Sequence, residues 1–203
     1  FWPGITALAI SDLRAGRRST QTGLYTIEDD AVPLAGPGAS GGTAYYSKAT
    51  GGTEQNGWLR VEGGRLVNNR GQAIQLRGMS SHGIAWFPQY TRHGAIRTTQ
   101  EYGANMFRIA MYVDQTAGNY TQVTSDKQKN KRAVYTAVNN TLRLGMYAIV
   151  DWHIYEQGNP IYRVDCAVEF FDEVSRRYAN EPGVLYEICN EPNGYTSWDD
   201  VYD

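Results

Sequence analysis

The stretch Val-Leu-Tyr-Glu-Ile-Cys-Asn-Glu-Pro-Asn, residues 184–193, gives the strongest indication of both fold and chemistry. It is an apolar run, typical of a buried strand, that ends in Asn190, Glu191 and Pro192. Because proline has no N–H to donate to a sheet, we expect the strand to stop there and to leave Glu191 at its mouth. A carboxyl group partly shielded from water has a raised pKa, which suits it to donate a proton near neutral pH. A solvated loop glutamate is the alternative that this tripeptide alone leaves open.

Strands and helices alternate along the chain from residue 58 onward. After a hairpin at 59–67, we expect strands at 73–77, 105–111, 146–152 and 184–189, and helices at 96–102, 127–144 and 161–178. Such alternation is typical of parallel βα units, and it leaves a barrel and a doubly wound sheet both open. No glycine-rich phosphate loop follows the first strand, which weakens the dinucleotide-binding version of the doubly wound sheet.

Polar residues gather where the predicted strands end. They are Ser81, His82, Tyr112, Asp114, Asp151, His153, Asn190 and Glu191. The carboxyl ends of the strands are where a (β/α)8 barrel builds its active site, and a closed barrel takes about 250 residues. We therefore expect an α/β fold over residues 58–203, the N-terminal half of a (β/α)8 TIM barrel. An open edge with exposed apolar inner side chains would make this half unstable alone, or pair it with another half-barrel.

Residues 1–57 form the expected N-terminal extension. The part from 31 to 57 is rich in glycine, serine and threonine and poor in large apolar residues, so it predicts a flexible linker. The part from 1 to 30 has no clear period, and we assign it no function. The chain starts at Phe1 without a signal-peptide pattern, so we expect the natural protein to begin earlier.

The composition is that of an ordinary globular protein, with 41% apolar and 20% charged residues. A net charge of −2 argues against nucleic acid or an anionic membrane as the main partner. No run of 18 apolar residues occurs, so we expect no membrane span. Cys166 and Cys189 are predicted to be buried thiols. The three histidines lack the spacing of zinc ligands, so we expect no metal.

Four motifs occur in order in residues 58–200 and together resemble a known family. They are Leu-Arg-Gly-Met-Ser-Ser-His-Gly at 76–83, Phe-Arg-Ile-Ala-Met-Tyr at 107–112, Asp-Trp-His-Ile at 151–154 and Tyr-Glu-Ile-Cys-Asn-Glu-Pro-Asn at 186–193. This set resembles the bacterial-type cellulases of glycoside hydrolase family 5. The resemblance implies a (β/α)8 barrel, retaining endo-β-1,4-glucanase activity, a β-1,4-glucan as the partner, secretion from the cell and no cofactor.

The resemblance also implies roles for individual residues. Glu191 is similar to the acid/base of the family, and Asn190 to the residue that hydrogen-bonds the sugar 2-hydroxyl. The residues similar to the shell around the scissile bond are His82, Arg108, Tyr112 and His153. Trp86 is similar to a platform on which a glucose ring stacks. A buried ion pair for Arg108, a structural hydrogen bond for each histidine and a core position for Trp86 are the alternatives.

Retaining hydrolysis needs a second carboxylate roughly 5–5.5 Å from the acid, as the nucleophile. In the family this is a glutamate on the seventh strand, which would lie beyond residue 203. Glu187 is four residues from Glu191, or about 13 Å along a strand, so it does not fit. Asp151 lies on a neighbouring strand but would approach from the same side as the acid. We therefore expect the nucleophile to be missing here, and the alternatives are a non-catalytic carbohydrate-binding half-barrel or a β-mannanase of the same clan.

Overall fold

The computed structural model describes residues 51–113, 119–121, 126–154, 158–197 and 199–202. In chain order the elements are α3 (Thr53–Asn56), β1 (Arg60–Glu62), β2 (Arg65–Val67), β3 (Gly78–Ser80), the 3-10 helix η1 (Pro88–Thr91), α4 (His93–Glu101), β4 (Met106–Tyr112), α5 (Lys127–Arg143), β5 (Tyr147–His153), α6 (Val164–Arg177), β6 (Val184–Glu187) and α7 (Asp199–Tyr202). A parallel sheet in the order β3-β4-β5-β6 forms the centre, and the antiparallel hairpin β1-β2 is a separate sheet. The expected segment 1–30 and most of the expected linker lie outside the described residues.

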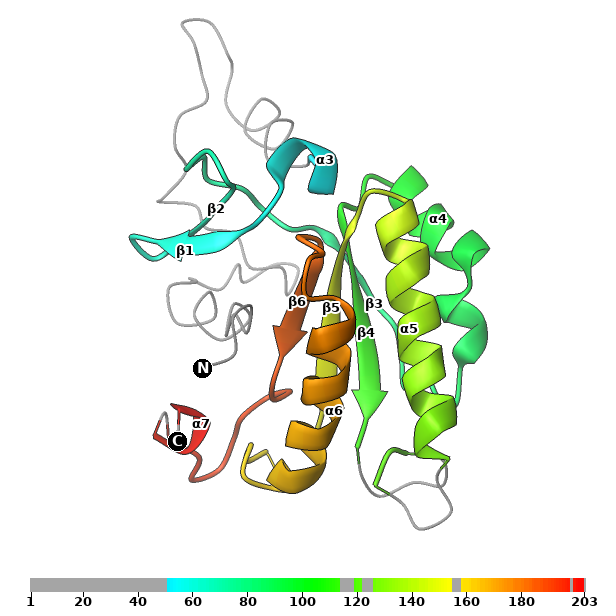
Figure 1. The fold of residues 1–203 in the computed structure, drawn as a ribbon, viewed down its shortest axis with the longest axis vertical. Coiled ribbons are helices and arrows are strands. Elements are labelled where there is room, and N and C mark those ends of the chain that lie inside the picture. The colour runs from blue at the N-terminus through cyan, green and yellow to red at the C-terminus, as the bar shows by residue number, and fades with distance from the viewer. Residues whose placement is uncertain (1–50, 114–118, 122–125, 155–157, 198, 203) are drawn as a thin grey trace, which may run out of the picture.

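The sheet is the one expected from the alternation of strands and helices. Its strands follow one another in sequence order, all parallel, and each successive pair from β3 onward is joined by a helix: α4, α5 and α6. In Figure 1 the strands run downward, so their carboxyl ends lie at the end of the molecule opposite α3. The strand order and the parallel pairing are those of consecutive βα units in a barrel.

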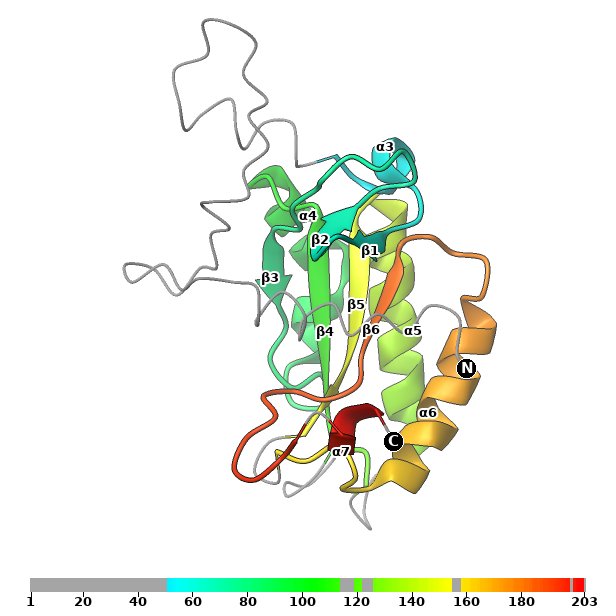
Figure 2. The same ribbon diagram turned by 90° about the vertical axis from the view of Figure 1, so that its left-hand side faces the viewer.

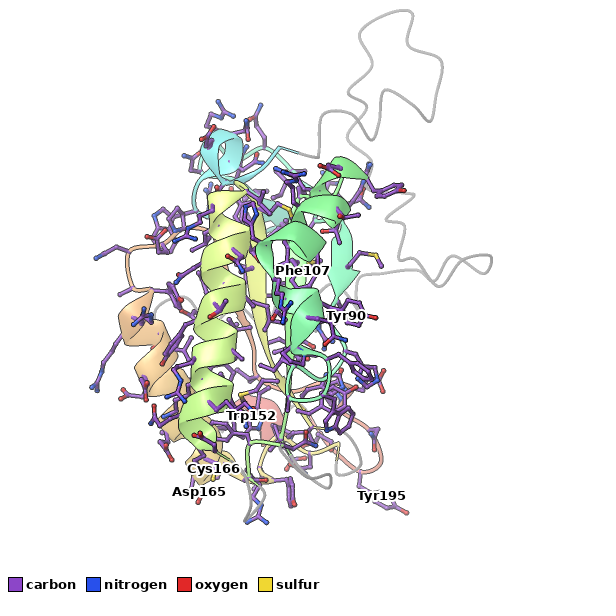
Figure 3. All side chains as sticks on the ribbon, turned by 90° about the vertical axis from the view of Figure 1, so that its right-hand side faces the viewer. Tyr90, Phe107, Trp152, Asp165, Cys166 and Tyr195 are labelled. Carbon is purple, nitrogen blue, oxygen red and sulfur yellow. The ribbon has the colours of Figure 1, made fainter. Side chains whose placement is uncertain are left out.

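The face of the sheet that meets the helices holds the main hydrophobic core. Alternate residues of β4 and β5 point to this face, among them Ile109, Val150 and Trp152, each 0% exposed. Helices α5 and α6 cover it with the buried side chains Val134, Ala137, Val138, Phe170, Phe171 and Val174. Figure 3 shows Trp152 behind these helices. Burial of each large side chain contributes about 1.5–3 kcal/mol, so this layer fixes the strands that carry the polar residues.

The opposite face of the sheet is the inner face of the barrel, and the hairpin β1-β2 covers its amino end (Figure 2). Leu66 of β2 packs against Leu185 of β6, with Ile149 of β5 beside them. Leu185 is only 6% exposed. The expectation that the apolar inner side chains lie exposed is therefore wrong for this cluster, although Met79 on the edge strand β3 is 59% exposed. Instability of the chain alone stays a prediction.

Residues 51–57 are attached to the amino end of the barrel, although their composition predicts a linker. The backbone N–H of Thr53 donates to the carbonyl of Gly145 at 2.8 Å. Asn56 is buried, donates to the Gly51 carbonyl and accepts from Asn68. Because these backbone and amide groups have fixed partners, the segment lies on the barrel.

Four predicted elements differ by two residues or more in their bounds. Helix α4, expected at 96–102, is found at His93–Glu101. The first barrel strand is found at Gly78–Ser80 and not at 73–77, because Ala73 instead bridges back to Val67 beside the hairpin. Helix α6 begins at Val164, three residues later than expected, after a left-handed residue with φ 58°. Its thiol Cys166 is only half-buried, whereas Cys189 is buried as predicted. Strand β6 ends at Glu187, two residues before the predicted end.

Candidate active site

Strand alternation and parallel register place the polar residues of the inner face in successive tiers. From the amino to the carboxyl end the tiers are Arg108–Ile149–Leu185, then Ala110–Asp151–Glu187, then Tyr112–His153. The first tier is apolar apart from its arginine, and it rests on the hairpin. The second tier contains two carboxyl groups and the small side chain of Ala110. The small methyl group of Ala110 leaves room for the Arg108 side chain to extend toward the carboxyl end of the sheet, where it contacts both carboxylates.

Arg108 is the centre of the site. Its Nε and Nη2 atoms donate to the two oxygens of Glu187, at 2.7 and 2.6 Å, which is a two-point contact. Nη2 also lies 2.9 Å from Oδ2 of Asp151 and 2.9 Å from Oδ1 of Asn190. Nη1 donates to the Ser80 hydroxyl at 3.3 Å. Arg108 is therefore in contact with residues of β3, β5, β6 and the segment after β6.

In this cluster two buried carboxyl groups share one guanidinium cation. The side chains of Asp151 and Glu187 are 0% and 9% exposed, and Arg108 is their shared cation. Burial would lower the pKa of Arg108, but the hydrogen bonds that it donates to Glu187 and the charge of Asp151 outweigh it, so the pKa is raised. Burial raises the pKa of Glu187, the Arg108 hydrogen bond opposes this, and the charge of Asp151 raises it further. The site thus holds two carboxyl groups in one low-dielectric space.

His153 is fixed by the same carboxylate cluster. Its Nδ1 lies 2.6 Å from Oδ2 of Asp151, as the shared strand face predicts. A carboxylate oxygen can only accept a hydrogen bond, so Nδ1 is the donor in this contact. The other Asp151 oxygen, Oδ1, is buried and has no hydrogen-bond partner among the described residues. The structural hydrogen bond considered as the alternative for His153 is therefore present, and it also orients the ring.

Aromatic rings continue from His153 toward the loop after β3. The rings of His153 and Tyr112 are stacked, with centroids 4.0 Å apart and planes 5° apart. His82 stacks on the other side of Tyr112 at 5.4 Å, and Trp86 meets Tyr112 edge-on at 5.0 Å. The backbone N–H of Gly83 donates to Nδ1 of His82 at 2.7 Å. Trp86 is half-buried within this group and lies beside the site. Its half-burial is compatible with both a core position and a sugar-binding platform.

Asn190 and Glu191 differ in their surroundings. Asn190 is buried, accepts from Arg108 through Oδ1 and donates through Nδ2 to the carbonyl of Ile154 at 3.1 Å. Glu191 is exposed, and its φ of 42° lies in the left-handed region that non-glycine residues seldom adopt. The expectation of a partly shielded carboxyl group at a strand mouth is therefore wrong in this structure. Pairing ends at Glu187, so Pro192 is not the residue that stops the strand.

The structure thus brings most of the predicted site residues together. Arg108 and Asn190 are directly bonded, and His153, Tyr112, His82 and Trp86 follow through Asp151 and the stacked rings. Glu191 is adjacent to the cluster in sequence, and Asp114 lies outside the described residues. Sequence reasoning missed the partnership of Glu187 with Arg108. Glu187 pairs in register with Asp151 on the neighbouring strand, so the two carboxyl groups lie side by side. This pairing is the signal that could have indicated the contact of Glu187 with Arg108.

The described residues offer neither a metal cluster nor a membrane span. No group of three or more histidine, cysteine, aspartate or glutamate side chains there is arranged to hold a metal ion. No helix in the described ranges is long and apolar enough to cross a membrane. The expectations of a metal-free, cofactor-free protein stay predictions.

The parallel βα units and the polar cluster at their carboxyl ends define part of a TIM-barrel domain with its active-site end. The family model described as Cellulase (glycosyl hydrolase family 5) matches residues 67–203. The chain belongs to this family.

Several relatives are endoglucanases. One from Clostridium saccharobutylicum is 38% identical over 158 residues, which covers 77% of this chain and 34% of the relative. Endoglucanase E-5 of Thermobifida fusca is 37% identical over 168 residues, which covers 82% of this chain and 34% of the relative. The crystal structure of the Thermobifida fusca endoglucanase Cel5A (E5) catalytic domain matches with a TM-score of 0.67 and 35% identity, covering 73% of this chain and 47% of that one. The chain spans about a third of the length of these curated relatives.

Proposed function

We propose that the protein containing this chain is an endo-β-1,4-glucanase that hydrolyses cellulose or related β-glucans. The observation that carries this proposal is the Arg108–Asn190 pair, which fixes a buried amide directly before Glu191 at the carboxyl end of a family 5 barrel. The names of the relatives support it, and the E355Q variant of the Thermobifida fusca enzyme was crystallised in complex with cellotetraose.

In the proposed mechanism Glu191 protonates the leaving oxygen of the glycosidic bond and then deprotonates the water that completes the retaining reaction. The Asn190 amide hydrogen-bonds the sugar 2-hydroxyl, a contact that strengthens in the transition state. A left-handed backbone at Glu191 is a costly conformation of the kind found at functional sites, which supports a role for this loop.

The reaction also needs a nucleophilic carboxylate on the other side of the sugar. Asp151 and Glu187 are poor candidates, because both are buried and bonded to Arg108. We propose that the nucleophile is a glutamate of the whole protein that lies beyond residue 203 and is missing from this chain. The mass of the natural gene product tests this: a mass near the 22.7 kDa of this chain would contradict it.

The sugar chain is proposed to lie along the aromatic side chains next to this cluster. Trp86 would stack on a glucose ring, because aromatic faces bind the apolar faces of sugars. His82, Tyr112 and His153 would line the path from Trp86 to the scissile bond, and the ring contacts that join Trp86 and His82 to Tyr112, and Tyr112 to His153, support this.

The decisive variant is Glu191→Gln in the full-length gene product, with Glu181→Gln, an exposed glutamate in the turn before β6, as the matched control. Loss of a general acid should lower the turnover of cellotetraose by about 10²–10⁴-fold. Binding of cellotetraose, measured by calorimetry, should persist, and a substrate with an activated aryl leaving group should lose less rate. Unchanged hydrolysis would refute the role of Glu191. Binding without hydrolysis in the wild type would favour a carbohydrate-binding module, and faster cleavage of mannan would favour a β-mannanase.

We also propose that the protein is secreted, because cellulose is an insoluble polymer that its hydrolase must meet outside the cell. Detection of the protein in the culture medium of its host, separated from a cytosolic marker, tests this. Retention with the marker would refute it.

A further inference from the structure

Glu187 has no role in the proposed reaction, yet it makes the most specific contact of the site. It ends strand β6, its side chain is 9% exposed, and both of its oxygens accept from Arg108. A buried ion pair of this kind is weak evidence for a role in stability, because well-packed apolar residues often stabilise such a position as well or better. A role in geometry explains the contact better.

Glu187 controls the plane of the guanidinium. Its contact uses Nε and Nη2 together, and two parallel hydrogen bonds fix both the position and the plane of the fork. The contact between Asp151 and Arg108 joins Nη2 to Oδ2, and a contact of one atom pair leaves rotation of the guanidinium about it open. Ser80 and Asn190 each meet one nitrogen of Arg108, so it is the two-point contact with Glu187 that fixes the plane of the guanidinium.

The orientation of Arg108 in turn fixes Asn190. A guanidinium can only donate, so the amide must turn its oxygen toward Nη2, at 2.9 Å. The carbonyl of Ile154 can only accept, so the amide must turn its nitrogen toward it, at 3.1 Å. The two contacts agree on one amide rotamer, and Asn190 is 6% exposed, so the rotamer is held inside the protein.

We propose that Glu187 is a positioning residue: it holds Arg108 in the plane that fixes the side-chain amide of Asn190. This inference rests on the proposed glucanase function, since the amide is proposed to bind the sugar 2-hydroxyl. Glu187 does not contact the reacting atoms, and it acts only through Arg108. Its removal should lower the turnover number more than it raises KM, because the amide contact strengthens in the transition state.

The test uses Glu187→Gln and Glu187→Asp in the full-length gene product. Glu173→Gln is the control. Glu173 lies on helix α6, where, like Glu187, it pairs with a cation; it also accepts a hydrogen bond from a tyrosine, and both partners lie on helix α5. Glu187→Gln should lower kcat on cellotetraose by about 10²-fold with little change in KM, since a misplacement of about 1 Å has an effect of this size. Glu187→Asp, which keeps the charge, should restore part of kcat, and Glu173→Gln should leave it unchanged.

Two further measurements separate positioning from stability. In an Arg108→Lys background, which cannot form the two-point contact, Glu187→Gln should have no additional effect on kcat. The side-chain amide signal of Asn190 in ¹⁵N NMR, assigned with Asn190→Asp, should move in Glu187→Gln and stay in Glu173→Gln. A wild-type kcat in Glu187→Gln, or an undiminished effect in the Arg108→Lys background, would overturn the inference. If the wild type does not hydrolyse β-glucans, the proposed function fails, and the amide signal alone decides: an unmoved signal overturns the positioning role and a moved signal supports it.

Discussion

Replacing Arg108 by leucine tests the electrostatic account of the site. The change removes the shared cation of Asp151 and Glu187, whose side chains are 0% and 9% exposed, and leaves two carboxyl groups without it in the interior. Breaking a buried pair by removing one partner costs about 3–5 kcal/mol, and this figure applies to the cluster as a whole because its contacts are not additive. Arg108→Leu should therefore lower the free energy of unfolding at pH 7 by about that amount.

The dependence on pH gives the sharper result. The folded-state pKa of Glu187 is raised by burial and by the charge of Asp151, while Arg108 opposes the rise. Without Arg108 the pKa should rise further. A carboxyl group with a raised folded-state pKa favours the folded state at low pH and loses that contribution as the pH rises through the folded-state pKa. The penalty of Arg108→Leu should accordingly shrink as the pH falls from 7 toward 5, because the Glu187 carboxyl group binds a proton.

The assay is urea denaturation followed by circular dichroism at both pH values, on wild type, Arg108→Leu and Arg108→Leu combined with Glu187→Gln. Arg176→Leu is the control, since Arg176 pairs with Asp172 on the surface of α6 with 78% and 44% exposure. That surface pair should contribute less than about 1 kcal/mol. The combined variant should recover part of the loss at pH 7. A loss no larger than that of Arg176→Leu, or a loss that is equal at both pH values, would refute the reasoning.

Three further outcomes are expected. Phe170→Ala should lower the free energy of unfolding by about 3–5 kcal/mol in urea denaturation, because the ring is fully buried among other aromatic rings; a loss below that of a surface substitution would contradict this. Iodoacetamide should modify Cys166 well before Cys189 in the folded protein, as read by peptide mass spectrometry, because Cys189 is 1% exposed and burial raises its pKa to about 12; equal rates would contradict the burial. Lys131→Met should cost less than about 1 kcal/mol, because its partners are half-exposed and methionine can fill the space of its stem; a loss above 3 kcal/mol, roughly that of a buried pair, would contradict this.

The parts of the fold that were predicted well depend on local patterns. Helix α5 was expected at 127–144 and is found at Lys127–Arg143, because its apolar period and the glycine after it lie within one segment. The hairpin was found where its glycine turn predicts. The first barrel strand was displaced because Ala73 finds its partner, Val67, across the hairpin, and this non-local pairing is not visible in the pattern of residues 73–77.

The candidate site divides in the same way. The motifs identified Arg108, His153 and Asn190, and strand alternation predicted the bond between His153 and Asp151. The contact of Glu187 with Arg108 was missed because the two residues are 79 positions apart in the sequence, on strands that β5 separates. The exposure of Glu191 was also missed, because the predicted strand ran to residue 189, whereas hydrogen bonding ends it two residues earlier, at Glu187.

The sequence by itself determined the alternation of strands and helices, the end of the sheet at which polar residues gather, and the family, because each of these depends on order and spacing along the chain. Only the tertiary structure decided which carboxyl group Arg108 binds, how the amide of Asn190 is turned and which apolar inner side chains the hairpin covers. These depend on register between strands and on charges brought together in a space shielded from water, where one shared cation must serve two carboxyl groups.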